Sequence, residues 1–263
     1  NAIEAVKSGE AVAAVSAGNT GALIALSMFI LRKVEGVHRP ALVGSWPTRY
    51  GVCAMLDLGA DIAADAEQLV EFAIMGAAFS RAVHGVQNPR VAILNIGEEE
   101  LKGHESIREA ARLMRVSNLP IDFRGFIEPD KIGHGNADVV VTDGFTGNVA
   151  IKTAEGIARM ISDMLKDAFK SGPLAMLGAA LVLPAMKAFR SKMDPRNTNG
   201  GVFLGLNGVV VKSHGGTDDV GFAQAIHVAA SMGESNFRKE VEENLGRLAP
   251  TLAAAAPAET AAS

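Results

Sequence analysis

Short apolar runs alternate with longer amphipathic stretches along most of the chain. The apolar runs are rich in Val, Ile and Ala, so they predict buried strands, whereas stretches with a period near 3.6 residues predict helices. The strand-like runs are Ala11–Ser16, Ala41–Trp46, Val52–Asp57, Val91–Asn95, Ile121–Ile127, Asp138–Thr142 and Val209–Ser213. The helical stretches are Ala22–Val34, Asp65–Val83, Glu105–Val116, one that starts near Gly147, and Asp218–Met232. The alternation predicts a three-layer α/β fold, with a mostly parallel sheet and helices on both faces.

Two of the predicted strands end in turns of small and polar residues that lead into helices. Backbone N–H groups at a helix N-terminus carry partial positive charge, so both turns are candidate anion sites. Two such loops in one chain suggest a substrate with two parts. The alternative is that both are ordinary tight turns between a strand and a helix. The loop residues are Asn19, Thr20 and Gly21 after the first run, and Thr146, Gly147 and Asn148 after Asp138–Thr142.

The composition excludes several classes of function. The chain has 263 residues and a formal net charge of −4, which argues against a nucleic-acid binder because neutralising phosphates needs a basic surface. Cys53 is the single cysteine, so a disulfide framework and a cysteine metal site are excluded, consistent with a reducing cytoplasm. The six histidines have no spacing typical of a zinc site.

The segment Gly172–Arg190 is rich in Leu and Met and has no charge before Lys187. It is too short to span a bilayer. One interpretation is a helix buried in the core or at a dimer interface. The other is a helical hairpin, within about residues 160–195 and turned at Pro184, that lays a Leu/Met surface on a membrane beside a basic flank.

The two ends of the sequence differ in character. The first ten residues predict an amphipathic helix that leads straight into Ala11–Ser16, as in the middle of an α/β domain, which suggests an N-terminally incomplete unit. Residues 250–263 are of low complexity and predict a disordered tail. We therefore expect one α/β domain over residues 1–249, followed by that tail.

Five motifs, in order along nearly the whole chain, resemble the PlsX family of bacterial phosphate acyltransferases. The resemblance implies transfer of a fatty acyl group from acyl-acyl carrier protein to inorganic phosphate, which forms acyl phosphate for phospholipid biosynthesis. It implies no metal or organic cofactor, a fold similar to that of isopropylmalate dehydrogenase, and a homodimer. The motifs are Val15–Leu23 (VSAGNTGAL), Leu56–Ala60 (LDLGA), Leu94–Glu99 with Lys102 and Gly103, Asp138–Thr153, and Asn207–Gly215 (NGVVVKSHG).

The chain also departs from the family pattern. The family's opening strand and its Asp-Ala-Met-Gly-Gly-Asp loop are absent, Asp61 stands where Asn is usual, and Asn199 stands where the family has the Tyr of a Tyr-Gly-Gly motif. An acyl phosphate is unstable and lipophilic. The resemblance therefore favours a cytoplasmic protein, peripheral at the inner face of the plasma membrane, that works beside a downstream glycerol-3-phosphate acyltransferase.

Residue chemistry assigns roles within these motifs. The thioester oxygen needs a hydrogen-bond donor as it becomes an oxyanion, and the leaving thiolate benefits from a nearby acid. Lys212 and His214 end a buried run and share a face by strand alternation, so we assign the thioester to them, with Asp143 to orient a donor. Direct attack by phosphate is favoured over a covalent acyl-enzyme. The predicted phosphate and substrate residues are Ser16, Asn19, Thr20, Gly21, Asn95, Gly97, Thr146, Gly147, Asn148 and Lys152.

Structural alternatives remain for these residues and for the function. In the alternative interpretation, His214 is a structural histidine that is hydrogen-bonded beside a glycine turn, Asp143 only forms a turn, and Lys152 is a solvated side chain. A phosphotransacetylase-like enzyme would transfer the acyl group from coenzyme A. A dehydrogenase relative would need a glycine fingerprint followed by an acidic residue, and the sequence offers no good one. A non-catalytic module would only bind phosphate or carrier protein.

Overall fold

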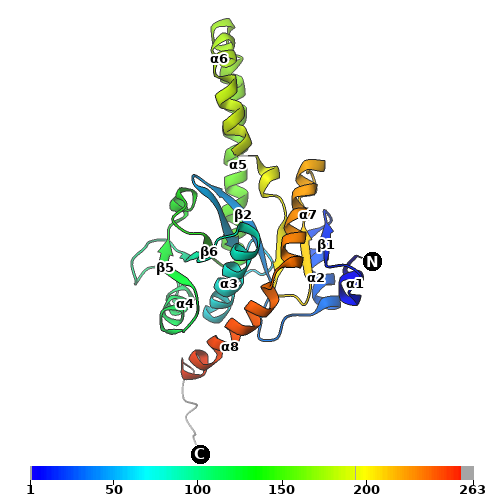
Figure 1. Cartoon of the computed structure of the whole chain (residues 1–263). Coiled ribbons are helices and arrows are strands. Elements are labelled where there is room, and N and C mark those ends of the chain that lie inside the picture. Colours follow the sequence, from blue (N-terminus) through cyan, green and yellow to red (C-terminus); the bar gives the residue numbers. More distant parts are fainter. Residues whose placement is uncertain (1, 193, 256–263) are drawn as a thin grey trace, which may run out of the picture.

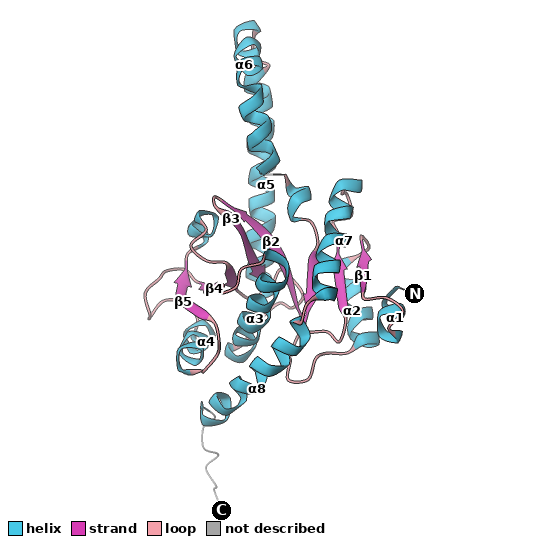
Figure 2. Cartoon of the chain, viewed as in Figure 1, coloured by secondary structure: helices cyan, strands magenta, loops and turns pink. Residues whose placement is uncertain are grey.

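The computed structural model describes residues 2–192 and 194–255, and within them eight strands form one sheet (Figures 1 and 2). The strands are β1 (Ala13–Ser16), β2 (Ala41–Thr48), β3 (Gly51–Leu56), β4 (Arg90–Leu94), β5 (Asp122–Ile127), β6 (Val139–Val141), β7 (Gly201–Leu204) and β8 (Val209–Lys212). The α-helices are α1 (Ala2–Ser8), α2 (Thr20–Leu31), α3 (Ala66–Phe79), α4 (Glu105–Val116), α5 (Gly144–Phe169), α6 (Pro173–Lys192), α7 (Asp219–Glu234) and α8 (Phe237–Ala255). Shorter helical turns are η1 (Ser80–His84), η2 (Pro129–His134) and η3 (Pro195–Thr198).

The sheet has the strand order β1-β8-β7-β2-β3-β6-β4-β5 and reverses direction in its middle. β1 and β8 are parallel to each other, and β3, β6, β4 and β5 form a second parallel group. Between the groups lie three antiparallel pairings, of β8 with β7, β7 with β2, and β2 with β3. Because three reversals separate them, the two parallel groups run in opposite directions. Their carboxyl ends therefore leave the sheet toward opposite sides.

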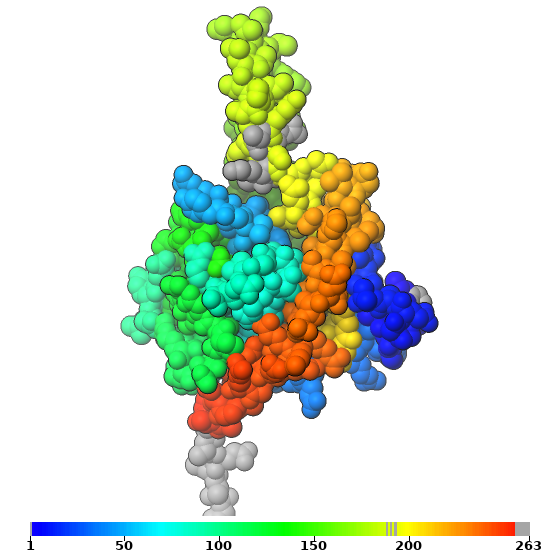
Figure 3. Space-filling model, viewed as in Figure 1, coloured from blue at the N-terminus to red at the C-terminus, as the bar shows by residue number. Residues whose placement is uncertain are grey.

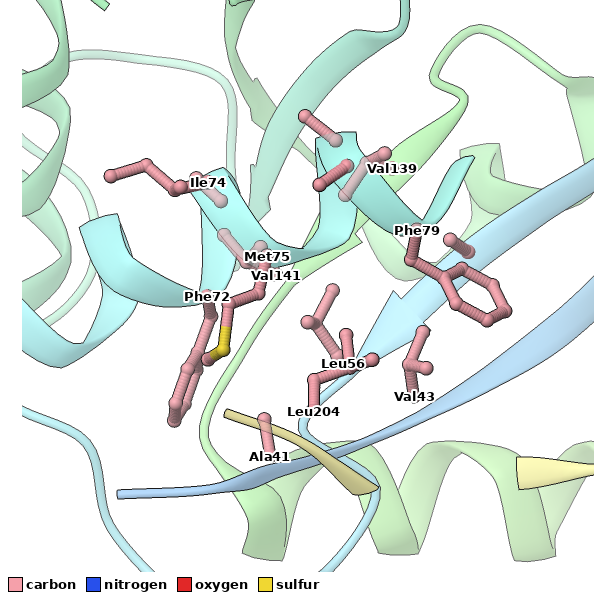
Figure 4. Close-up of a cluster of buried hydrophobic side chains, with 14 of the residues drawn as sticks. Ala41, Val43, Leu56, Phe72, Ile74, Met75, Phe79, Val139, Val141 and Leu204 are labelled. Carbon is pink, nitrogen blue, oxygen red and sulfur yellow. The ribbon is translucent and has the colours of Figure 1, made fainter. Parts of the chain in front are cut away.

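Helices cover both faces of this sheet, as the hydrophobic pattern predicts. On one face, α3, α4, α7 and α8 pack over a large cluster that includes Phe72, Phe79 and Leu204 (Figure 4). On the other face, α1 and α2 cover β1 and β8 through residues such as Leu23. The opposite half of that face is covered in part by η2, through Ile132. The predicted α/β fold is confirmed.

Helices α5 and α6 stand out as a hairpin, at the top of Figure 1 and as the projecting column in Figure 3. The chain turns at residues 170–172, and α6 then continues through Pro184. The protruding hairpin is confirmed, but its predicted turn at Pro184 is wrong. The carbonyl that loses its helical donor to Pro184 belongs to an exposed helix, where water can replace the donor. The buried-core interpretation is also wrong, since Leu174, Leu177 and Leu181 are exposed.

Helix α8 is not predicted by the sequence pattern, and it includes residues that the composition assigns to a disordered tail. It continues through Pro250 to Ala255, because Leu248 is buried and Leu252 packs against the main core cluster. Residues 256–263 of the expected tail lie outside the described residues. Throughout the described part of the chain, every helix is too short or too polar to cross a membrane.

Candidate functional site

The ends of β1 and β8 bring two of the predicted motifs together. The two strands are parallel, Ser16 is the register partner of Lys212, and the backbone N–H of Ser213 donates to the carbonyl oxygen of Ser16 at 2.9 Å. Both strands therefore end at the same level, as the carboxyl ends of parallel neighbours do. The loop at residues 17–19 and the loop at residues 213–218 leave the sheet side by side.

The first of these loops is shaped by two polar side chains. The Ser16 hydroxyl accepts a hydrogen bond from the N–H of Gly18 at 3.1 Å. Asn19 is the N-cap of α2, and its side-chain oxygen accepts from the N–H of Ala22 at 3.0 Å. Thr20 is then the first residue of an uncharged apolar helix, whose first N–H groups have no partner within the helix. The predicted order of strand, turn and helix is confirmed here, and an anion at this turn stays a prediction.

Lys212 is half-buried at the end of β8. It lies two residues after Val210 and so on the same face of the sheet, which α1 and α2 cover. Burial lowers the pKa of the Lys212 ammonium, because a low-dielectric environment disfavours the charged form. The Nζ atom donates to the carbonyl oxygen of Ser213. A lysine with these properties is a better proton donor than one in water.

His214 follows Lys212 and is exposed, but its main chain and one ring nitrogen are fixed. Its backbone N–H donates to Oδ1 of Asn199 at 2.9 Å. Its Nδ1 atom accepts from the N–H of Gly216 at 3.1 Å. A ring nitrogen that accepts carries no proton, so this hydrogen bond places the proton of the neutral imidazole on Nε2. The ring therefore presents an N–H donor on the side away from the glycine turn.

The second predicted anion loop has a different local geometry. Helix α5 begins at Gly144, earlier than predicted, because Asp143 serves as its N-cap. The Asp143 carboxylate accepts from the backbone N–H of Thr146 at 2.8 Å and from the Thr146 hydroxyl at 2.7 Å. The N–H of Gly147 donates to the carbonyl oxygen of Asp143 at 2.9 Å. The N–H groups of Thr146 and Gly147 and the Thr146 hydroxyl thus already have hydrogen-bond acceptors within the chain.

The glycines of this loop have a packing role. A Cβ atom at Gly144 would overlap the carbonyl oxygen of Asp61, and one at Gly147 would overlap the carbonyl oxygen of Asp57. The first turn of α5 can therefore approach the chain after β3 only if both residues are glycine. Asn148 lies against Gly59 in that segment, and Lys152, one turn further on, is exposed.

Asp57 is a residue that the sequence reasoning missed. Its carboxylate is fully buried and accepts from the N–H groups of Leu42 and Asp61 at 2.9 and 2.8 Å. The N–H groups of Gly59 and Ala60 donate to it as well. Burial raises the pKa of Asp57, and the four hydrogen bonds oppose that shift. The sequence signal for it is an Asp that directly follows the apolar run Val52–Leu56 and stands two residues before Gly59.

Asn95 and Gly97 follow β4, beside the end of β6. Asn95 is buried, with Nδ2 donating to the carbonyl oxygen of Lys102 at 3.1 Å and Oδ1 accepting from the N–H of Ile96 at 2.9 Å. Gly103, with φ 84, lies against the Asn95 amide. In this structure Asn95 therefore organises its own loop.

The topology separates the predicted site residues into two sets. Those at the ends of β1 and β8, from Ser16 to Gly21 and at Lys212 and His214, lie together. Those at the ends of β4 and β6 form the second set, and they leave the sheet toward the opposite side. The fold therefore does not bring Asn19 and Thr146 together into a single phosphate site.

One group of possible metal ligands occurs among the described residues, and it involves neither set. It consists of His38, Glu67 and Glu71. Nδ1 of His38 lies 2.5 Å from Oε1 of the buried Glu71 and 3.9 Å from Oε1 of Glu67. The backbone N–H of His38 also donates to Glu71, at 2.9 Å. These contacts are those of a hydrogen-bonded ion pair that joins the chain before β2 to α3.

Comparisons of the sequence with known proteins identify the family. A family model described as "Fatty acid synthesis protein" matches residues 1–240. The phosphate acyltransferase of Caulobacter vibrioides is 56% identical over 254 residues, which are 97% of this chain and 71% of that protein. The phosphate acyltransferase of Parvibaculum lavamentivorans is 55% identical over 247 residues, which are 94% of this chain and 68% of that protein.

Solved structures of the same fold have more distant sequences. A phosphotransacetylase from Streptococcus pyogenes has a TM-score of 0.60 and 20% identity, over 89% of this chain and 66% of that one. The EutD phosphotransacetylase of Staphylococcus aureus has a TM-score of 0.55 and 19% identity, over 86% and 65%. The chain spans just under two thirds of both, and the likeness concerns the fold alone. From its sequence relatives, the chain belongs to the phosphate acyltransferase family.

Proposed function

We propose that this protein transfers a fatty acyl group from acyl-acyl carrier protein to inorganic phosphate, and that it uses no metal or organic cofactor. Membership of the phosphate acyltransferase family supports the transfer to phosphate. The pairing of Ser16 with Lys212 is the observation that supports this location for the reaction. It places the N-terminus of α2, a half-buried ammonium group and the Nε2–H of His214 at neighbouring strand ends.

The chemistry assigned to this set follows from its donors. The phosphate binds at the N-terminus of α2, near Thr20 and Gly21, where backbone N–H groups and Lys212 offset its charge. A phosphate oxygen attacks the thioester carbon, and the carbonyl oxygen becomes an oxyanion that accepts from Nε2–H of His214. Collapse then breaks the carbon–sulfur bond. The lowered pKa of Lys212 suits it to protonate the leaving thiolate.

The second set of residues, at the ends of β4 and β6 and in the first turns of α5, has a smaller role in this proposal than the sequence predicts. Since Asp143 accepts the donors of Thr146 and Gly147, we assign the rest of the substrate, rather than the phosphate, to Asn148 and Lys152. The exposed ammonium of Lys152 suits the acidic surface of a carrier protein. Asn95, Gly97 and Asp143 then act by shaping the loops of this set.

The test is release of free carrier thiol from long-chain acyl-acyl carrier protein, with and without phosphate and with no added cofactor. We expect release only with phosphate, and acyl phosphate as the product. A parallel reaction with long-chain acyl-coenzyme A identifies the donor. Faster transfer from coenzyme A would support the phosphotransacetylase-like alternative, and an absence of both reactions with retained carrier-protein binding would indicate a binding module.

We also propose that the α5–α6 hairpin attaches the protein to a membrane, in a cytoplasmic enzyme peripheral at the inner face of the plasma membrane. Its apolar side chains are exposed, including Met164 at 63%, Leu174 at 82% and Leu181 at 77%. Apolar surface of this extent is stabilised when it leaves water. Attachment would release a lipophilic acyl phosphate beside a downstream glycerol-3-phosphate acyltransferase.

A homodimer is part of the same proposal. Helix α2 has an exposed apolar side that includes Leu26 at 48% and Phe29 at 80%. An interface between two copies of the chain would remove these side chains from water. Sedimentation velocity measured at several protein concentrations tests this, and a monomer at all of them would overturn it.

A further inference from the structure

Asn199 lies between η3 and β7 and is 9% exposed. A buried amide needs partners for its two N–H groups and its carbonyl oxygen, since burial without them costs free energy. Asn199 has three such partners, and all of them lie in the chain that follows β8. It therefore fixes a segment far from it in sequence.

Each of its polar atoms is engaged. Nδ2 donates to the hydroxyl of Ser213 at 2.9 Å and to the carbonyl oxygen of Gly221, in the first turn of α7, at 2.6 Å. Oδ1 accepts from the backbone N–H of His214 at 2.9 Å. One side chain thus joins the start of β7, the end of β8 and the start of α7.

The surroundings keep this amide in place. Ser213 is fully buried, and its N–H donates to Ser16 in β1. Gly200, with φ 116, would bring a Cβ atom to 3.0 Å from the Cα of Ala225 in α7, so a glycine is required where the chain passes that helix. The backbone before and after Asn199 is thereby set against α7 and the sheet.

We propose that Asn199 is a positioning residue, which fixes the main chain at Ser213 and His214 and so orients the His214 ring for reaction at the thioester. This rests on the proposed function. Without the Asn199 carbonyl, the N–H of His214 loses its partner, and the turn that brings the Gly216 N–H to Nδ1 loses its anchor. The ring then samples other orientations and both neutral tautomers.

The test is the variant Asn199→Ala, with Asn199→Asp beside it. The aspartate retains an acceptor for the His214 N–H but has no N–H for Gly221. We expect kcat to fall by about 100-fold in Asn199→Ala, as for a reacting group that is slightly misplaced, and less in Asn199→Asp. The KM for the acyl donor should change by less than about threefold, because the lost interaction acts on the transition state.

Nitrogen-15 NMR of the histidine rings supplies a readout independent of activity. In the wild type the His214 shifts should be those of the Nε2–H tautomer, and in Asn199→Ala those of a tautomer mixture. The control is Asn207→Ala, which removes a comparable hydrogen bond, from Nδ2 to the carbonyl oxygen of Lys33 at 2.7 Å. It should retain both kcat and the His214 shifts.

A folded Asn199→Ala protein with wild-type kcat or wild-type His214 shifts would overturn the proposal. If that variant does not fold, the same two measurements on Asn199→Ser decide, because the shorter serine side chain also removes the acceptor for the His214 N–H. A wild-type protein that releases no carrier thiol with phosphate would remove the proposed function. The NMR comparison would still establish whether Asn199 orients His214, so the two failures are distinguishable.

Discussion

Lys212 and His214 are separated by one residue, yet their surroundings suit them to different tasks. Lys212 is half-buried, and its pKa is lowered by that burial. His214 is exposed, and its proton is assigned to Nε2 by the hydrogen bond that Nδ1 accepts. A donor for the oxyanion and a proton source for the thiolate are what the proposed transfer requires.

The variants Lys212→Ala and His214→Ala should therefore lower kcat more than they change KM. A positioned acid contributes about 10²–10⁴-fold to a rate, so a loss of this size in kcat is expected for each. Steady-state kinetics with acyl-acyl carrier protein and phosphate measure it. His134→Ala, an exposed histidine in η2, is the control and should behave as wild type. A raised KM with unaltered kcat would make the two residues substrate-binding groups only.

The His38–Glu71 pair predicts how stability depends on pH. The hydrogen bond to Glu71 raises the pKa of His38 above its ordinary 6.5. A group whose pKa is raised by folding contributes its full stabilisation at pH values below its pKa in the unfolded chain. That contribution is lost as pH rises through its pKa in the folded protein. The melting temperature of the wild type should therefore exceed that of His38→Gln most at about pH 6, and by less at about pH 8.5.

Melting curves of both proteins across that range, at constant ionic strength, test this prediction. Burial also raises the pKa of Glu71, so charging this carboxylate as pH rises lowers the stability of both proteins, and the comparison between them isolates the contribution of His38. Glu67 and Asp65 also raise the pKa of His38. A difference in melting temperature that grew with pH would contradict the prediction.

At the scale of single elements, α5 shows how one helix serves two regions of the molecule. Its first turn is locked onto the chain after β3 by Gly144, Gly147 and the Asp143 cap. Its second half leaves the sheet and pairs with α6 in the hairpin. The glycines thus have a packing role, whereas the sequence predicts either an anion site or an ordinary tight turn at this position.

Gly147→Ala should destabilise the protein, because the new Cβ would overlap the carbonyl oxygen of Asp57. Overpacking of this kind costs about 1–3 kcal/mol. Gly156→Ala in the same helix is the matched control. A Cβ there meets nothing within 4 Å, so the better helix propensity of Ala should stabilise by up to about 1 kcal/mol. Chemical denaturation measures both, and equal effects would contradict the packing argument.

The hairpin makes a prediction about membranes. Leu177 and Leu181 are 61% and 77% exposed, so changing both to Glu should leave the fold intact. Burying each leucine in an apolar phase contributes about 1.5–3 kcal/mol, so the double variant should no longer sediment with anionic liposomes while soluble acyl transfer persists. Leu101→Glu, at an 84% exposed site outside the hairpin, should still sediment.

The mass of the same double variant separates the remaining interpretations. A dimer that persists together with activity supports attachment to the membrane. If the dimer and the soluble activity were lost together, the hairpin would be an interface between subunits and the membrane proposal would fail. Light scattering alongside the liposome assay gives the mass under matching conditions.

Across the whole molecule, the sequence predicts the helices, loops and hairpins whose formation depends on neighbouring residues. Helix α4 has the predicted bounds, since buried Ala111 and Met114 alternate with charged Arg112 and Arg115. The loop that leads from β1 into α2 is likewise encoded by neighbouring residues, as is the β2–β3 hairpin.

The arrangement of the two anion-type loops could not be predicted in this way. It depends on the antiparallel pairing of β2 with β7, which joins segments far apart in the chain and sets the direction of one parallel group against that of the other. The hydrogen bonds that join Asn199 to His214 and Asp57 to Leu42 could not be predicted for the same reason. A side chain's partners across the fold leave no periodic pattern in its own segment.

The pairing of β1 with β8 also has a consequence during synthesis. Strand β1 is synthesised before its parallel neighbour, which is made only when the ribosome reaches Val209–Lys212. Until then, the apolar side of α2 that packs with Val210 has no sheet to cover. Long-range pairings of this kind form slowly and leave apolar surface exposed. The nascent chain is thus expected to become resistant to protease in this region only once β8 has emerged.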